Sequence, residues 1–264
     1  MLVIDDSNYK ELIGTGTEVD FGGVSRKLCY RPKTPGLSGK YARKPDFKLI
    51  PRNEWASRIK DIEQSGSGLM TRARKMGKRC LDQASTNYCH ANSCVNGLVY
   101  ARMVQGEAYV DLSPGSIGGP ATNFQNAGAY INQDLEVAIE RGAASVEFVP
   151  PNQVSKNGWK AGAEENALLH RAAFYYDLMS KSDGKMFDRV MTLLLQGNAL
   201  PNGYNWWSHS VCSVQPYYDG VDYGIWTENS WGPSFQDHGF FVMKEGRGTP
   251  DDAYCIQLAS ASVK

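Results

Sequence analysis

Four residues of the types that carry out thiol chemistry occur in order along the chain: Gln83, Cys89, His209 and Asn229. Cys89 stands where a helical pattern begins, and Gln83 precedes it by six positions. His209 opens an alternating apolar run, and Asn229 follows within Asn-Ser-Trp-Gly. A thiol, a histidine to move its proton, an asparagine to orient that histidine and a glutamine to donate a hydrogen bond are the groups that thiol acyl transfer needs. The sequence therefore predicts nucleophilic catalysis by Cys89.

The place of Cys89 at a helix start predicts an activated thiol. Unpaired N–H groups and the helix dipole favour the thiolate there, and a facing imidazolium of His209 adds a full positive charge. We expect a thiolate–imidazolium pair at rest, with His209 acting as general acid and then as general base. Asn229 is expected to accept a hydrogen bond from the second ring nitrogen of His209, and Trp231 to shield that bond from water. The backbone N–H of Cys89 and the side-chain amide of Gln83 are expected to bind the oxyanion.

The elements that must position these residues follow from hydrophobic periodicity. Apolar residues at helical spacing predict helices at residues 91–104, 133–141, 163–180 and 186–196. Alternating, β-branched and aromatic runs predict strands at residues 209–215, 223–227, 239–244 and 254–259. Helices precede strands, which indicates an α+β protein with a helical lobe over roughly residues 80–200 and a β lobe over roughly 203–260. A ligand is expected in the cleft between the lobes.

Residues 1–48 differ in composition from the rest of the chain, with few apolar residues and many Gly, Pro, Lys and Arg. They are predicted to form an extended basic arm rather than a core element, followed by one globular domain over residues 49–264. The arm is a candidate to bind a protein partner or a neighbouring subunit. Five cations at residues 72–79 have no acid among them. Because no aromatic residues are interleaved, we interpret them as a solvated loop rather than a phosphate-binding patch.

Three stretches of the chain resemble papain-like cysteine peptidases: residues 82–91 around Cys89, residues 208–211 around His209, and residues 226–232 with 239–241 around Asn229. The likeness covers roughly residues 49–260 and is most specific at Asn-Ser-Trp-Gly. It implies a papain-like fold, in which the nucleophile helix of the helical lobe packs against a β-barrel-like lobe. It also implies that Cys89 is the nucleophile, His209 the base, Asn229 its orienting partner and Gln83 the oxyanion glutamine of a peptidase.

The sequence departs from that family at several places, among them Thr86, which stands where many members have a disulfide cysteine. His90 replaces the tryptophan usually found after the nucleophile, and it is a poor rival base because adjacent helical residues point about 100° apart. Residues 198–207 are short for the strand and loop expected before His209. Residues 1–48 are shorter than the inhibitory prosegment of the lysosomal members and lack its helical pattern, so zymogen control by such a prosegment is not expected.

Composition limits the partners and the compartment. Lys plus Arg and Asp plus Glu both number 28, so the overall charge favours neither nucleic acid nor an anionic membrane, and no apolar run is long enough to span a bilayer. The acidic N-terminus predicts no secretory signal peptide. Six cysteines without a CxxC pair predict free thiols in a cytoplasmic or other reducing compartment. No metal or cofactor is expected, because Cys89, His90 and Cys94 match no common zinc spacing.

Two further functions remain compatible with these residues. A structural or assembly protein, for example part of a larger particle, could retain the fold with a quiescent cleft. A related thiol amidase or isopeptidase would apply the same groups to another acyl donor. The function that the residues favour is a cysteine peptidase that hydrolyses a peptide or protein substrate through a Cys89 thioester.

Overall fold

The structure is a computed structural model, and it describes residues 1–12, 17–33, 39–180 and 183–259. Within these residues the α-helices are α1 (Trp55–Ser65), α2 (Leu69–Lys75), α3 (Cys89–Val104), α4 (Pro114–Ala121), α5 (Ile131–Glu140), α6 (Ala163–Leu168) and α7 (Met186–Leu195). The strands are β1 (Val3–Ile4), β2 (Glu18–Phe21), β3 (Val24–Lys27), β4 (Ala42–Arg43), β5 (Phe174–Asp177), β6 (Leu200–Tyr204), β7 (His209–Tyr218), β8 (Tyr223–Glu228), β9 (Phe240–Lys244) and β10 (Asp252–Gln257). Short 3₁₀ helices are η1 (Tyr9–Leu12), η2 (Arg52–Glu54), η3 (Lys156–Gly158) and η4 (Leu178–Ser180).

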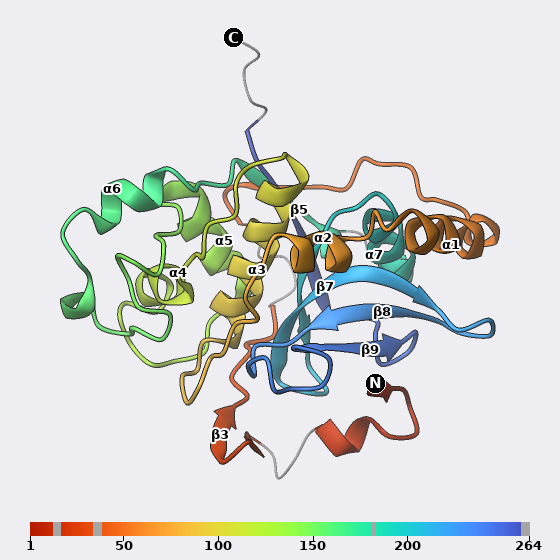
Figure 1. The fold of residues 1–264 in the computed structure, drawn as a ribbon, viewed down its shortest axis with the longest axis horizontal. Helices are drawn as coiled ribbons and strands as arrows, with labels where there is room; N and C mark the ends of the chain where they lie inside the picture. The colour runs from red at the N-terminus through yellow and green to blue at the C-terminus, as the bar shows by residue number, and fades with distance from the viewer. Residues whose placement is uncertain (13–16, 34–38, 181–182, 260–264) are drawn as a thin grey trace.

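Helix α3 lies at the centre of the molecule (Figure 1). Helices α4 and α5 pack against it from one direction, and strands β6 and β7 from another. Every side chain from Cys89 to Tyr100 is buried as a result. A helix covered on all sides is held by packing more than by its own propensity. This packing fixes the place of Cys89, its first residue.

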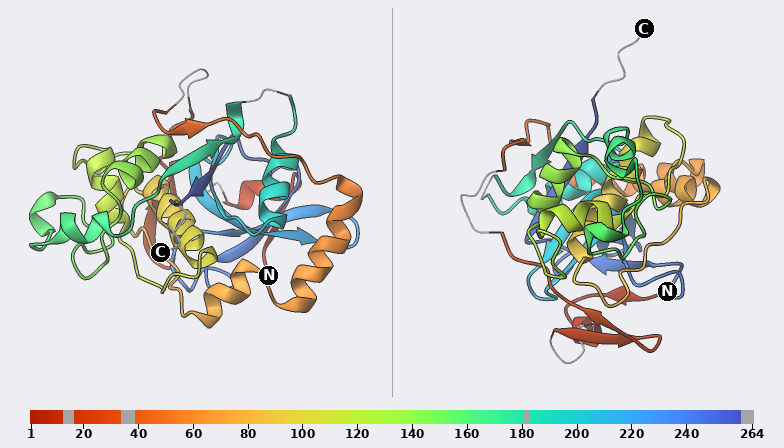
Figure 2. Two further views of the ribbon diagram at one scale, coloured as in Figure 1. Left: turned by 90° about the horizontal axis from the view of Figure 1, so that it is seen from above. Right: turned by 90° about the vertical axis from the view of Figure 1, so that its left-hand side faces the viewer.

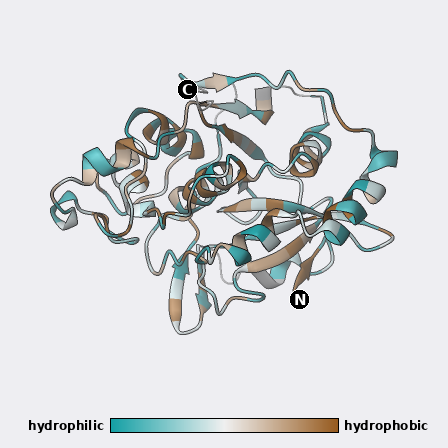
Figure 3. Cartoon of the chain, turned by 45° about the horizontal axis from the view of Figure 1, so that its top comes forward, coloured by the Kyte–Doolittle hydropathy of each residue, from teal (hydrophilic) through white to brown (hydrophobic). Residues whose placement is uncertain are grey.

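Eight strands form one mixed sheet in the order β1-β9-β8-β7-β6-β10-β5-β4. The strands from β9 to β5 pair antiparallel, whereas β1 joins β9 and β4 joins β5 in parallel. One apolar cluster joins α1, α7 and β8 through Trp55, Val190 and Ile225. Apolar residues concentrate in the central strands, and the peripheral helices carry many hydrophilic ones (Figure 3). No helix among the described residues combines the length and the apolarity needed to cross a lipid bilayer.

The predicted α+β class is confirmed, with α3 to α6 gathered beside the sheet (Figure 1). The helices expected at residues 91–104, 133–141 and 186–196 correspond to α3, α5 and α7, and the four expected strands to β7, β8, β9 and β10. The β part of the protein is the eight-stranded sheet. Its strands β1, β4, β5 and β6 come from outside the predicted β lobe or from its border, so the sheet draws on the whole chain.

The predicted helix at residues 163–180 is wrong over most of its length. Helix α6 ends at Leu168, and β5 begins at Phe174 and pairs with β10 and β4. Helical spacing assigned Leu168 to a buried side, but it is 52% exposed. In β5 burial alternates, with Tyr175 and Asp177 inside, as the period of a strand requires. Aromatic residues are common in strands, and pairing with β10 makes residues 174–177 a strand rather than a helix.

Residues 198–207, expected to be too short for a strand, do form one. Strand β6 pairs with β7 along its whole length and with the start of β10. Pro201 cannot donate to a ladder, but the β10 pairing covers only Asn202 and Gly203. The proline therefore costs the sheet no hydrogen bond on that side. Tyr204, the last residue of β6, then pairs with His209, the first residue of β7, and both strands contact α3.

The expectation that residues 1–48 contribute nothing to the core is wrong for the parts of this segment that the structure describes. Ile4 is fully buried, and Leu28 and Tyr30 are 3% and 5% exposed. Strands β1 and β4 form the two edges of the main sheet. Residues 34–38, within the predicted Gly/Pro-rich stretch, lie outside the described residues. A few buried apolar side chains thus hold this segment against the rest of the protein.

The basic cluster at residues 72–79 is only in part the solvated loop that was expected, with Arg74 and Arg79 exposed. Its first part lies in α2, and four of its cations have partners: Arg72 with the Met103 carbonyl, Arg74 with Asp237, Lys78 with Glu228 and Arg79 with Asp111. The acids come from distant parts of the chain, which is why the local sequence shows none. Folding therefore neutralises most of the cluster's charge.

The ion pair of Lys78 and Glu228 lies inside the protein, next to the candidate site. Their charged atoms are 2.6 Å apart, and the side chains are 3% and 1% exposed. Tyr100 donates to Glu228 at 2.7 Å, and Lys78 donates to Asn96 at 2.9 Å. The pair therefore connects the loop after α2, helix α3 and the end of β8. Glu228 comes directly before Asn229 in the sequence.

Replacing Lys78 by Met should lower the free energy of unfolding by about 3–5 kcal/mol, because a buried carboxylate loses its counter-ion. Urea unfolding of the two proteins measures the difference. Arg58→Met is the matched control, since Arg58 pairs with Glu54 at the surface, where both side chains are 48% and 42% exposed. That variant should change the free energy by less than about 0.5 kcal/mol. Equal effects for the two substitutions would contradict the structural role of the buried pair.

Candidate active site

His209 and Asn229 lie side by side at the adjoining ends of β7 and β8. His209 Nε2 is 2.8 Å from Asn229 Oδ1. The backbone N–H of Ser230 donates to the same oxygen, also at 2.8 Å, which fixes the amide with its oxygen toward the ring. Nε2 must therefore carry the proton of this bond, and the lone pair of the neutral ring is on Nδ1. Nδ1 is buried and has no hydrogen-bond partner among the described residues. His209 is thus set to accept a proton at Nδ1.

Two tryptophan rings enclose His209. The centroid of its ring lies 4.6 Å from that of Trp207, in an edge-on contact, and 5.5 Å from that of Trp231. His209 is fully buried, and burial lowers its pKa to about 4, against the Asn229 hydrogen bond, which raises it. The imidazole is therefore neutral near pH 7. Trp231 thus lies against the His209 ring, as expected for a side chain that shields the hydrogen bond between His209 and Asn229.

Gln83 is tied to the same loop. Its backbone N–H donates to the Ser230 carbonyl at 2.8 Å, and its Oε1 accepts from Ser230 Oγ at 2.7 Å. With the side-chain oxygen held there, Nε2 faces the other way and donates to the carbonyls of Lys27 at 3.0 Å and Thr86 at 3.1 Å. Both amide hydrogens are thus in use. One of the two acceptors belongs to the N-terminal part of the chain.

Cys89 is the first residue of α3 and is fully buried. One turn later, Ser93 Oγ lies 2.6 Å from Ser210 Oγ, a contact that holds the start of α3 against β7. Burial raises the pKa of the Cys89 thiol to about 12, against the backbone N–H groups of Cys29 and Ser210, which lower it. Ser210 follows His209, so the Cys89 sulfur lies beside the histidine strand. The expected thiolate–imidazolium pair is not what this buried arrangement favours, because burial leaves both groups neutral.

The structure thus brings the four predicted residues to one place. Ser230 connects Gln83 to Asn229, and Asn229 holds His209. Cys89 reaches the same place through the packing of α3 on β7. Residues from three distant parts of the chain therefore meet at the start of one helix.

Residues 17–31, here called the N-terminal strap, cover this place. Strands β2 and β3 form a hairpin, which lies against one side of the molecule (Figure 2, right). Phe21 of the hairpin stacks on Trp231, with ring centroids 6.2 Å apart. Arg26, 4% exposed, forms an ion pair with Asp82. The hairpin is thereby anchored at two points, on Trp231 of the Asn-Ser-Trp-Gly loop and on Asp82, which precedes Gln83.

Beyond the hairpin, the strap passes over Cys89. The Lys27 carbonyl accepts the hydrogen bond from Gln83 Nε2, and the Tyr30 N–H donates to the Ser208 carbonyl at 3.0 Å. These two bonds fix the backbone between them. Cys89 has no exposed surface in this arrangement.

Gly128 forms the opposite wall of this passage. A Cβ built on Gly128 would lie 1.8 Å from the Cys29 carbonyl oxygen, so only glycine permits the close approach of the strap. The Arg31 N–H also reaches the neighbouring Ala129 carbonyl, at 3.4 Å. The strap therefore lies between two walls, one from the sheet and one from the helical side.

The sequence analysis missed the strap, although a signal for it is present. Two runs of four residues, Glu18–Phe21 and Val24–Lys27, flank Gly22-Gly23, and both glycines have positive φ, 64° and 73°. Two glycines between short strand-forming runs are a known hairpin pattern. The argument that residues 1–48 lack a helical prosegment does not exclude an inhibitory segment, because a hairpin reaches the site instead.

His90 does not compete with His209. Its Nδ1 lies 2.7 Å from Asp134 of α5, and its Nε2 lies 3.3 Å from the Ala127 carbonyl. His90 and Asp134 are both fully buried. The side chain therefore fastens α5 and the loop before Gly128 to the nucleophile helix, in agreement with the expectation that it is a poor rival base.

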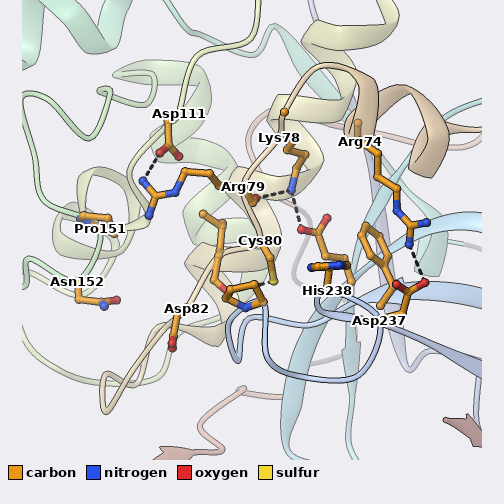
Figure 4. A pocket seen from close by; sticks show the side chains of 16 residues that line it. Arg74, Lys78, Arg79, Cys80, Asp82, Asp111, Pro151, Asn152, Asp237 and His238 are labelled. Atoms are coloured by element: carbon orange, nitrogen blue, oxygen red, sulfur yellow. Dashed lines mark hydrogen bonds and ion pairs between the residues drawn. The ribbon is translucent and has the colours of Figure 1, made fainter. Parts of the chain in front are cut away.

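A cavity of about 680 Å³ lies next to the strap (Figure 4). Leu81 and Asp82, just before Gln83, line it, as does Pro233, which follows the Trp231-Gly232 turn. Figure 4 shows charged side chains around it, with ion pairs that join Arg79 to Asp111 and Arg74 to Asp237. The cavity therefore combines apolar walls with several charged side chains, and it lies directly beside the residues that precede Gln83. Among the described residues, no group of three or more His, Cys, Asp or Glu side chains is placed to hold a metal ion.

No protein-family model and no curated protein matches this sequence. Solved structures share its fold. Xylellain, a cysteine protease from Xylella fastidiosa, superposes with a TM-score of 0.63 at 15% identity, over 89% of this chain and 98% of its own.

Two proenzymes are also similar in structure. Procathepsin L 3 from the larval midgut of Tenebrio molitor gives a TM-score of 0.58 at 14% identity, over 69% of this chain and 66% of its own, so the match spans about two thirds of that protein. Procathepsin B S9 from Trypanosoma congolense gives 0.54 at 13% identity, over 72% and 76%. The chain therefore has the fold of the papain-like cysteine proteases, as its sequence motifs predict.

Proposed function

We propose that the protein is a cysteine peptidase that hydrolyses peptide bonds through a thioester on Cys89. The observation that carries this proposal is the oriented His209 ring, whose Nε2 donates to Asn229 and whose Nδ1 is unpartnered among the described residues. A merely structural histidine in a buried site usually has both nitrogens bonded. A free basic nitrogen on the strand against which the start of the Cys89 helix packs supports nucleophilic catalysis.

The chemistry requires the strap to leave the site first. Solvent and substrate then replace the strap, and the thiol transfers its proton to Nδ1 of His209. The Cys89 thiolate attacks the substrate carbonyl carbon, and the negative charge moves to the carbonyl oxygen. The Gln83 amide, released from Lys27, and the Cys89 backbone N–H are the donors for that oxygen. His209 returns its proton to the leaving amine as the C–N bond breaks, which leaves a thioester.

Hydrolysis of the thioester reverses the roles. His209 takes a proton from water, the resulting hydroxide attacks the acyl carbon, and the C–S bond breaks to restore Cys89 and a carboxylic acid. Asn229 keeps the ring in one tautomer through both halves of the reaction.

The strap supports a latent form of this enzyme. Its Lys27 carbonyl already occupies a hydrogen bond that a substrate carbonyl needs from Gln83. The buried site also raises the pKa of the Cys89 thiol and lowers that of His209. Both effects oppose formation of the thiolate–imidazolium pair. Opening the strap re-exposes the site to water and removes the burial that suppresses ionisation.

A second candidate function is a structural or assembly protein in which the strap never leaves. The position of the strap favours this second function. Gln83 Nε2 donates to the Lys27 carbonyl and the Ser208 carbonyl accepts from the Tyr30 N–H, so the strap occupies groups that a substrate would need. The two functions differ in whether Cys89 reacts in the folded protein.

Cys89→Ala and His209→Ala should each abolish peptide hydrolysis and retain the fold. Gln83→Ala should reduce kcat by about 10²-fold or more with a smaller change in KM, because its donor acts mainly on the developing oxyanion. Steady-state hydrolysis of a peptide mixture, with circular dichroism as the fold control, measures these effects. Full activity in either of the first two variants would exclude the proposed mechanism.

Weakening the strap should expose the thiol. Arg26→Met removes the half-buried ion pair with Asp82 and should raise the rate at which iodoacetamide alkylates Cys89 by roughly tenfold, the equivalent of one lost charged hydrogen bond. Ser25→Ala is the matched control, because Ser25 lies next to Arg26 but bonds only to the exposed Glu18. Peptide mass spectrometry after timed quenching gives the rate. An unchanged rate in Arg26→Met would contradict a strap held by this pair.

Acid should destabilise the closed protein through His209. Its pKa is about 4 when folded and about 6.5 when unfolded, so between these values only the unfolded chain binds the proton, and stability falls as pH falls. Relative to His209→Gln, the wild type should lose about 2–3 kcal/mol of unfolding free energy between pH 7 and 4.5.

Urea unfolding at the two pH values measures this difference. Asp252, whose pKa burial raises to about 7, acts in the opposite direction, but it is present in both proteins and cancels in the comparison. A difference between wild type and variant that is constant with pH would show that His209 is not held neutral in the folded state.

A further inference from the structure

The strap brings a second thiol to Cys89. Cys29 lies between Lys27 and Tyr30, the two strap residues whose backbones bond to the candidate site. The Cys29 thiol itself donates to Asn87 Oδ1 at 3.1 Å, two residues before Cys89. Hydrogen bonds before, at and after Cys29 therefore fix it over the start of α3.

The two cysteines are close enough to interact. The backbone N–H of Cys29 faces the Cys89 sulfur, and a charge on Cys29 raises the pKa of the Cys89 thiol. A disulfide needs Cα atoms about 4.4–6.8 Å apart, and a backbone amide directed at a sulfur atom brings its own Cα near that range. All six cysteines, each within the described residues, are free thiols, so both partners are available. Cys29 is partly exposed, whereas Cys89 is fully buried.

We propose that Cys29 and Cys89 form a reversible disulfide that locks the strap over the candidate site. The bond requires a two-electron oxidant, and hydrogen peroxide or another peroxide is the class that fits a site with one partly exposed thiol. Its regulatory meaning rests on the proposed peptidase function, but its chemistry does not. Nothing in this pairing needs substrate or turnover.

The atoms balance in two steps. Peroxide first oxidises the accessible Cys29 thiol: the O–O bond breaks, the sulfur takes one oxygen, and Cys29 becomes a sulfenic acid with release of one water. The Cys89 sulfur then attacks the Cys29 sulfur, the S–O bond breaks, and the departing hydroxide combines with the Cys89 proton to form a second water. The unpartnered Nδ1 of His209 can carry that proton during the attack. A reducing thiol pair reverses the bond by exchange and frees both cysteines.

The disulfide would add a covalent bond to the non-covalent contacts that hold the strap over the candidate site. In a reducing compartment the strap is held only by its hydrogen bonds, its ion pair and Phe21. Under peroxide the nucleophile itself is consumed in the lock, so that the open form cannot react. The oxidised site is also protected, because a disulfide is reversible while higher sulfur oxidation states are not.

The test is a thiol count and a peptide map of the full-length protein. After a short treatment with hydrogen peroxide and denaturing alkylation, alkylatable cysteines should fall from six to four. The lost mass should equal two hydrogens, and non-reducing digestion should give one peptide pair that joins Cys29 to Cys89. Dithiothreitol should restore all six thiols. A different pairing, or loss of Cys89 thiol without a linkage, would overturn the inference.

Two variants sharpen the result. Cys29→Ser should give no linkage, and Cys89 should remain an alkylatable thiol after the same short treatment, because the closed strap keeps it buried. Cys80→Ser is the matched control, because Cys80 is also partly exposed and lies near the Asn229 carbonyl, at 3.8 Å. It should form the linkage as the wild type does. Linkage in the wild type with no peptide hydrolysis under any condition sinks the proposed function alone, whereas hydrolysis that survives peroxide in full sinks the redox lock alone.

Discussion

The hydrogen bond from His209 Nε2 to Asn229 Oδ1 joins the start of β7 to the loop after β8, and the rest of the site is arranged around it. The Ser230 N–H fixes the Asn229 amide, and the Ser230 hydroxyl reaches Gln83. One short loop therefore sets the ring tautomer and the glutamine at the same time. The buried Lys78–Glu228 pair holds the end of β8, just before this loop, to α3 through hydrogen bonds to Asn96 and Tyr100. A displacement of the loop would move every group of the candidate site together.

The strap acts on the same site through burial rather than through a new charge. With the strap in place Cys89 and His209 are both fully buried, and burial raises the pKa of the thiol and lowers that of the imidazole. Groups that would ionise each other in an open cleft are kept neutral in a closed one. Latency and activity can thus be two states of one arrangement. The direction of each shift follows from desolvation, which is its largest cause in both residues.

What the sequence could predict was local. A helix starting at Cys89, a strand starting at His209 and a turn at Asn229 follow from periodicity and from residue type, and α3, β7 and β8 begin or end where those patterns do. What it could not predict depends on contacts between distant residues. The aromatic run of β5 has helical spacing in the sequence and becomes a strand only because β10 offers an edge. The cations of residues 72–79 find their acids far along the chain, and Gly22-Gly23 marks a hairpin without showing what it covers.

The central claim is that a folded Cys89 becomes a reactive nucleophile once the strap moves. An epoxide-based thiol-protease inhibitor tests it most directly, because such a reagent needs both the thiol and a proton donor in the site. The reduced protein is incubated with the inhibitor, and the adduct is located by peptide mass spectrometry. The account predicts a single adduct on Cys89 that is lost in His209→Ala. A folded protein in which Cys89 stays unmodified, even when Arg26→Met weakens the strap, would contradict it.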